Sequence, residues 1–262
     1  MSRRARLGFI SPSQDVRSDY LPILAAWSSP VEAYFAVVES VDDHDPAALA
    51  RYGGRIEDIW PGIEQLRPHC PDVVAYACTS GSFGHASGPE QQAAAMAAVA
   101  GVPAINTTQG FGAAVRALGV NRVAIAGTYP AATVALFAAY LQQQSVAVVA
   151  RTALNLPSGA EVTQLPADDV YGFVASSDDP AAEAVLVPDT ALATTQHIAG
   201  LEAELGKPVL AANQVTVWYA LLVAGVVARA PGFGHLLSPS IDSGNGGVEL
   251  NRERGLTQEV AG

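Results

Sequence analysis

Short apolar runs alternate with longer stretches of mixed polarity along most of the chain. The apolar runs lie at 7–10, 31–38, 73–77, 104–105, 123–126, 146–149, 184–187 and 209–210. Helical patterns are expected between them, near 46–67, 89–100, 109–118, 131–143, 191–205 and 213–228. Continuous apolar strands separated by helices are typical of parallel sheets that are covered on both faces. The pattern therefore predicts an α/β fold.

The pattern also repeats once within the chain. The stretch 72–79 (DVVAYACT) aligns with 183–190 (EAVLVPDT), about 110 residues further on. Two more pairs match in the same order and at nearly the same spacing: 101–106 with 206–211, and 6–10 with 122–126. We therefore expect two pseudo-symmetric lobes, each a parallel sheet flanked by helices.

The expected lobes have definite boundaries. The first comprises 1–115 and 216–237, and the second comprises 116–215. The remaining segment, 238–262, is glycine-rich and polar, which predicts a flexible or subunit-contacting tail. Ligands of parallel sheets bind beyond the carboxyl ends of the strands, so Cys78 and Asp189 are expected to face each other across one cleft. The alternative is that both are ordinary loop residues.

Composition narrows the classes of function. Half of the residues are hydrophobic and 15% are charged, which argues for a packed core and against disorder. The net charge of −11 disfavours nucleic acids and anionic membranes as partners. The two cysteines form no disulfide framework, and we expect a cytoplasmic protein without a signal peptide or membrane span. The five histidines are scattered, so we expect neither a metal nor another cofactor.

Several motifs resemble the aspartate/glutamate racemase superfamily, within it the branch of maleate cis-trans isomerases and arylmalonate decarboxylases. The similarity covers about residues 6 to 237. It is carried by 76–83 (YACTSGSF), 127–129 (GTY), 189–194 (DTALAT), 212–218 (ANQVTVW) and 232–236 (GFGHL). The resemblance implies a two-lobed fold with the active site between the lobes, a small carboxylate substrate, and a homo-oligomer.

The resemblance also shows where this chain departs from its relatives. Isomerases and racemases of the superfamily use two cysteines, one in each lobe, whereas the decarboxylase keeps only that of the second lobe. Cys78 falls on the first-lobe cysteine, but Asp189 occupies the second-lobe position. Asp15 replaces an asparagine that contacts a substrate carboxylate in the isomerases, and an ionised Asp15 would repel that group. Tyr129 matches a substrate-contacting tyrosine. These departures count against a symmetric dicarboxylate such as maleate.

The chemistry expected of the two central groups is complementary. Backbone N–H groups of Thr79, Ser80 and Gly81 are expected to point at Cys78, lower its thiol pKa and form a hole for a carboxylate or enediolate oxygen. Asp189 would serve as the acid or base, since a dry cleft raises the pKa of a carboxyl group. Other residues that we expect to bind substrate or oxyanion are Tyr129, Thr190 and Thr194.

Several of these residues also have a purely structural interpretation. A buried cysteine is often only a small hydrophobe. Asp189 could be a helix N-cap without a chemical role, and Asp15 could cap the helix that follows it. Tyr129 could be a packing residue with a hydrated hydroxyl. Cys70 is expected to be structural or at the solvent edge.

The leading hypothesis is a cofactor-independent cis-trans isomerase of the maleate isomerase type, acting on a small carboxylic acid through Cys78. A decarboxylase of substituted malonates is the first alternative. A racemase on the same fold and a non-catalytic ligand-binding protein also remain open.

Overall fold

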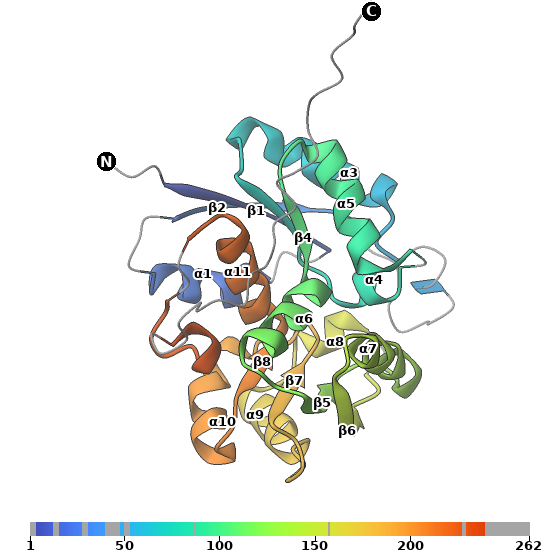
Figure 1. Ribbon diagram of the computed structural model, residues 1–262, viewed down its shortest axis with the longest axis vertical. Coiled ribbons are helices and arrows are strands. Elements are labelled where there is room, and N and C mark those ends of the chain that lie inside the picture. Colours follow the sequence, from blue (N-terminus) through green and yellow to red (C-terminus); the bar gives the residue numbers. More distant parts are fainter. Residues whose placement is uncertain are drawn as a thin grey trace, which may run out of the picture.

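A computed structural model describes residues 4–12, 16–27, 31–39, 48–49, 53–85, 87–156, 158–226 and 229–238 (Figure 1). Two four-stranded parallel sheets organise it. The first has the order β2 (Val31–Val37), β1 (Ala5–Ser11), β3 (Val73–Tyr76) and β4 (Ala104–Asn106). The second has the order β6 (Ala147–Ala153), β5 (Arg122–Gly127), β7 (Ala184–Val187) and β8 (Val209–Ala211). The predicted α/β fold and all eight predicted strands are confirmed.

Strand register confirms the internal repeat. In the first sheet Leu7 lies opposite Val73, and in the second sheet Val123 lies opposite Ala184. The sequence alignment pairs these same residues across the repeat, Leu7 with Val123 and Val73 with Ala184. The two halves therefore share strand order and the register of their central strands, and the loops after β3 and β7 occupy equivalent places.

Ten helices are described between and around these strands. They are α1 (Val16–Ala25), α3 (Ile56–Leu66), α4 (Ser80–Phe83), α5 (Gly88–Ala100), α6 (Thr107–Ala117), α7 (Ala131–Gln143), α8 (Gly159–Val162), α9 (Ala167–Ser176), α10 (Ile198–Leu205) and α11 (Ala212–Val223). Short 3₁₀ turns cover Arg67–His69, Thr195–His197 and His235–Leu237. In this described part of the chain, no helix is long and apolar enough to cross a membrane.

Helices α6 and α11 begin in the same way, directly after the last strand of each sheet. The side chain of Gln109 accepts a hydrogen bond from the backbone N–H of Asn106, and Gln214 accepts one from Ala211. Satisfying an otherwise unpaired N–H stabilises a helix start. Asn106 adds the reciprocal bond to the Gln109 N–H at 2.9 Å, which Ala211 has no side chain to make.

One hydrophobic core joins the two halves. It includes Phe9 and Ala75 from the first sheet and Ile125 and Leu186 from the second. Helix α11 follows β8 of the second sheet, yet it packs against α6, α1 and strands of the first sheet (Figure 1). This crossing of the chain agrees with assigning 216–237 to the first lobe, while the lobe boundaries themselves stay a prediction.

The helix predictions need four corrections. Helix α1 was expected only as a helix that Asp15 could cap, without bounds, and it carries Pro22 inside an otherwise regular segment. Helix α9 was not anticipated. Helix α10 begins at Ile198 rather than near 191, because turns occupy the chain after β7. Helix α11 ends at Val223, before the predicted end at 228. Part of the predicted helix 46–67, Asp15 and the segment 239–262 lie outside the described residues.

Candidate active site

Cys78 lies two residues beyond the carboxyl end of β3, and only 6% of it is exposed. The backbone N–H of Gly81 donates to its sulfur, with an N···Sγ distance of 3.4 Å. The hydroxyl oxygen of Ser80 is 3.6 Å from the same sulfur. A Cβ at position 81 would approach the sulfur to 3.1 Å and the Tyr76 hydroxyl to 2.8 Å, so glycine allows this contact. Donors of this kind stabilise a thiolate.

A buried amide network fixes the loop that carries Cys78. The side-chain N–H groups of Gln92 donate to the carbonyl oxygens of Gly81 and Gly54, both at 2.8 Å. Asn106 in turn donates to the Gln92 side-chain oxygen at 3.0 Å. Ser82 donates to the Cys78 carbonyl at 2.8 Å. Because these groups are buried and paired, the Gly81 amide is held in place beside the sulfur.

Asp189 occupies the equivalent place beyond β7 and is 4% exposed. One of its carboxyl oxygens accepts a hydrogen bond from the Thr128 hydroxyl, at the end of β5. The other accepts the backbone N–H of Ala191 at 2.8 Å, which closes an Asx turn. The helix-cap alternative for Asp189 is wrong, because the next α-helix begins only at Ile198.

Tyr129 links the Cys78 and Asp189 loops. Its ring meets Phe83 of the first loop edge-on, with ring centroids 6.3 Å apart. Its hydroxyl donates to the carbonyl of Pro188, directly before Asp189, at 3.2 Å. Only 1% of Tyr129 is exposed, so its hydroxyl is bonded to protein rather than hydrated. Tyr129 therefore connects the segment that carries Cys78 with the segment that carries Asp189.

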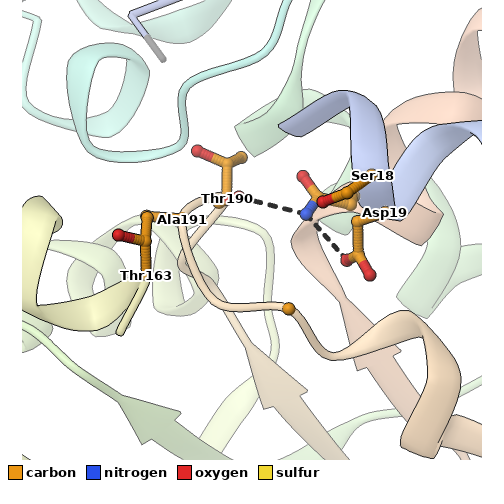
Figure 2. Close-up of a pocket in the computed structure, with 7 residues that line it drawn as sticks. Ser18, Asp19, Thr163, Thr190 and Ala191 are labelled. Atoms are coloured by element: carbon orange, nitrogen blue, oxygen red, sulfur yellow. Dashed lines mark hydrogen bonds between the residues drawn. The ribbon is translucent and has the colours of Figure 1, made fainter. Parts of the chain in front are cut away.

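A pocket of about 270 Å³ opens beside the Asp189 loop (Figure 2). It is lined by Ser18, Asp19, Thr163, Thr190, Ala191, Ala193 and Asn213. Figure 2 shows that Ser18 and Asp19 reach it from α1, whereas Thr190 and Ala191 reach it from the loop after β7. Its size is at the small end for ligand pockets, which suits a small molecule.

Asp19 is a buried carboxyl in this pocket, 7% exposed. It accepts hydrogen bonds from the side-chain N–H of Asn213 at 2.8 Å and from the backbone N–H of Thr195 at 3.2 Å. Burial raises the pKa of Asp19, and these hydrogen bonds offset the increase only in part. The sequence did not single out Asp19, because the helix expected after Asp15 was given neither bounds nor a buried face. Asn213 stood within a motif that carried the family resemblance, but without an assigned role.

The remaining expected site residues have different surroundings. Thr190 lines the pocket. The Thr194 hydroxyl donates to the Leu192 carbonyl at 3.0 Å, so it supports the loop. The Thr79 hydroxyl is buried without a hydrogen-bond partner. Cys70 is exposed, as expected, and takes a left-handed backbone conformation. Within the described ranges, no three histidine, cysteine or acidic side chains are grouped to hold a metal ion.

Comparison with known proteins gives the same fold and a family. The arylmalonate decarboxylase of Bordetella bronchiseptica is 27% identical over 213 residues, covering 80% of this chain and 81% of that protein. The maleate isomerase Iso from Pseudomonas putida S16 superposes with a TM-score of 0.78 at 22% identity, covering 90% of this chain and 99% of that one. A third relative is a cysteine-to-serine mutant of the maleate cis-trans isomerase of Nocardia farcinica, with a covalently bound succinylcysteine intermediate. It superposes with a TM-score of 0.80 at 20% identity, covering 90% of this chain and 98% of that one.

The sequence resemblance is therefore confirmed, and both kinds of relative are enzymes. A family model described as arylmalonate decarboxylase matches residues 45–237, which include Cys78, Tyr129 and Asp189. This match extends over more than half of the chain. The chain belongs to the arylmalonate decarboxylase family.

Proposed function

We propose that the protein is a cofactor-independent cis-trans isomerase of the maleate isomerase type, acting on a small unsaturated carboxylic acid. The observation that carries the proposal is the Gly81 N–H on the buried Cys78 sulfur, at the carboxyl end of β3. It supplies a fixed donor for a nucleophilic thiolate. The covalent succinylcysteine found in the Nocardia farcinica relative supports a cysteine adduct as the intermediate.

The chemical step needs only a thiolate and one proton. The Cys78 sulfur adds to one alkene carbon, and the electron pair of the double bond moves towards the substrate carboxylate as an enediolate. Asp189 delivers a proton to the adjacent carbon, and the former double bond then rotates as a single bond. Asp189 removes the proton again, the electron pair re-forms the alkene, and the thiolate leaves. Atoms and charge balance without an oxidant or reductant.

Asp189 suits the proton-transfer role in this scheme. Its oxygens are oriented by the Thr128 hydroxyl and the Ala191 N–H. A carboxyl group is a poorer nucleophile than a thiolate, but it exchanges protons readily. The pair therefore divides the work: Cys78 forms and breaks the covalent bond, and Asp189 moves the proton.

Decarboxylation of a substituted malonate is the second candidate, and the family match favours it. In that reaction the substrate loses CO₂, the electron pair stays behind as an enediolate, and the Cys78 thiol protonates the α-carbon. The Gly81 N–H would stabilise the thiolate that this proton transfer leaves behind, and a proton from solvent would restore the thiol.

Proton NMR of the full-length protein with unsaturated and malonate acids separates the candidates. We expect cis-to-trans conversion within a panel of cis-alkenoic acids that contains both maleate and maleamate, and no CO₂ release from phenylmalonate. Conversion should be lost in Cys78→Ala and retained in Cys70→Ala, the matched control at the exposed cysteine. CO₂ release without isomerisation would establish the second candidate, and full activity of Cys78→Ala would refute both mechanisms.

A further inference from the structure

Two residues that carry hydrogen-bond acceptors, Asp19 and Asn213, line the pocket beside the Asp189 loop. Both side-chain N–H bonds of Asn213 are used, one by Asp19 at 2.8 Å and one by the Thr190 carbonyl at 3.0 Å. The Asn213 side-chain oxygen is buried and has no hydrogen-bond partner. The orientation of the amide is fixed by its two acceptors, so the oxygen is the atom that is left without a partner. An unpaired buried oxygen of this kind is costly unless a ligand supplies a donor.

The Asp19 carboxyl reinforces this acceptor character. It accepts N–H groups from Asn213 and Thr195, and a carboxylate oxygen has lone pairs for further donors. The pocket's other polar lining consists of the hydroxyl-bearing residues Ser18, Thr163 and Thr190. A hydroxyl group can either donate or accept a hydrogen bond. These residues therefore do not change the preference for hydrogen-bond donors that Asp19 and Asn213 give the pocket.

No basic side chain lines this pocket within the described part of the chain. Arg17, the neighbour of Ser18 on α1, places its guanidinium over the Phe35 ring, 5.2 Å from the ring centroid. A carboxylate entering the pocket would meet the Asp19 carboxyl without a compensating cation. When Asp19 is ionised, these two like charges repel strongly in the partly desolvated site. When Asp19 is protonated, a carboxylate still has no N–H or O–H to give the Asn213 oxygen.

A neutral donor fits better than an ammonium group. Burial raises the pKa of Asp19, which shows that the pocket disfavours its ionised form. An ammonium ligand would need Asp19 ionised and would lose its own hydration on entry. A carboxamide N–H₂ supplies two donors and bears no charge, so it pairs with the Asp19 and Asn213 oxygens whatever the protonation state of Asp19.

We propose that this pocket is a specificity subsite for a neutral hydrogen-bond donor, with a carboxamide as the simplest group, so that the substrate carries one carboxylate and one amide. The inference rests on the proposed function for the reaction at Cys78, and it names the substrate class: half-amides of cis-unsaturated diacids. Maleamate is the smallest of these, and its trans isomer is the expected product.

Calorimetric titration of the full-length protein with saturated analogues tests the subsite without turnover. The probes are succinamate (amide), succinate (second carboxylate) and 4-aminobutyrate (ammonium). We expect succinamate to bind at least about tenfold more tightly than either of the others, since an unpaired charge in a desolvated pocket costs more than one decade of affinity. Equal or tighter binding of succinate or of 4-aminobutyrate would overturn the proposal.

The variant Asp19→Asn makes the assay more specific, because it replaces an ionisable carboxyl with a neutral amide of the same shape that can also donate hydrogen bonds. Succinate should gain affinity in this variant, and the preference for succinamate should narrow; a variant that only loosened the fold would weaken both ligands. Asp168→Asn, at an exposed aspartate on α9, makes the same charge change away from the pocket and should leave the preference unchanged. If Asp19→Asn does not fold, Thr163→Lys adds a cation at the exposed rim and should raise succinate affinity instead. An unchanged preference in the folded variant would refute the subsite.

The experiments can refute the amide subsite and the reaction at Cys78 independently of each other. A preference for succinamate without any isomerisation of maleamate would refute the reaction at Cys78 and leave the subsite standing. Isomerisation of maleate in preference to maleamate, together with tighter binding of succinate, would refute the subsite and leave the reaction standing.

Discussion

The loops after β3 and β7 occupy equivalent places in two sheets with the same strand order and the same register between their central strands, yet they hold different chemistry. The first carries a thiol that faces a backbone N–H. The second carries a carboxyl that accepts a hydroxyl and a backbone N–H. The first loop enters α4 at once, whereas the second passes through turns before α10.

The two halves of the repeat therefore share their backbone arrangement but differ in the reactive side chain that follows the equivalent strand. Strand order, the register of the central strands and the glutamine at the start of α6 and α11 recur in both halves. A symmetric pair of thiols would suit a reaction that treats both faces of a substrate alike. One thiol and one carboxyl suit a reaction in which one group forms a bond while the other moves a proton.

Replacement of the sulfur should give the largest effect. We expect Cys78→Ser to lower kcat by at least about 10³-fold, because a hydroxyl is far harder to ionise than a thiol and has no adjacent base on its own loop. Steady-state kinetics with the preferred cis-acid measure the loss, and circular dichroism checks the fold. A loss below tenfold would show that the first loop does not supply the nucleophile.

Replacement of the Asp189 carboxyl by an amide should have the next largest effect on kcat. We expect Asp189→Asn to lower kcat by about 10²-fold, the usual contribution of a general acid or base, with little change in KM. Asp179→Asn is a matched control, because Asp179 closes the same kind of Asx turn with the N–H of Ala181 at 2.8 Å. If both variants behave alike, Asp189 serves only the turn and the two loops do not share the chemistry.

The amide network behind the first loop should matter less. Gln92→Leu leaves the carbonyls of Gly54 and Gly81 and the amide of Asn106 without this partner, which should cost about 2–3 kcal/mol of unfolding free energy. Alkylation of Cys78 near neutral pH, measured in a Cys70→Ala background, should also slow, because the Gly81 N–H is less well held.

Gln142→Leu, at an exposed position on α7, provides the control for that substitution. It should change neither the unfolding free energy nor the alkylation rate by a measurable amount. Unaltered alkylation in Gln92→Leu, together with lowered stability, would limit Gln92 to a structural role.

The pH dependence of stability should show the smallest effect and should arise from Asp19. The folded-state pKa of this carboxyl is raised by burial, so the folded protein binds its proton more tightly than the unfolded chain does. Its stabilising contribution is full below the ordinary carboxyl pKa of about 4 and is lost as pH rises through the folded-state pKa. Urea denaturation from pH 4 to 7 should show wild type losing stability relative to Asp19→Asn. A constant difference, or one that grows in favour of wild type, would contradict this assignment.

Much of the fold could be predicted because apolar runs report burial directly. All eight strands, and the equivalence of Cys78 and Asp189, follow from runs such as 73–77 and 184–187, which must be buried on both faces of a sheet. The bounds of helix α1 could not be predicted in this way, because Pro22 and a weak polar-to-apolar periodicity hide them. Asp19 was therefore not singled out, and neither was the pocket that it lines.

The sequence by itself determined the class of fold, the repeat, and the presence of a thiol in one loop and a carboxyl in the other. These are local properties: burial is encoded by each run, and a residue follows a strand whatever lies around it. Only the tertiary structure decided what surrounds these groups, because the contacts join distant segments. Gln92 donates to the Gly81 carbonyl, Thr128 donates to Asp189, and Asn213 donates to Asp19 across 194 positions of the chain. Hydrogen bonds between such segments form only after the chain has packed, so no local pattern in the sequence encodes them.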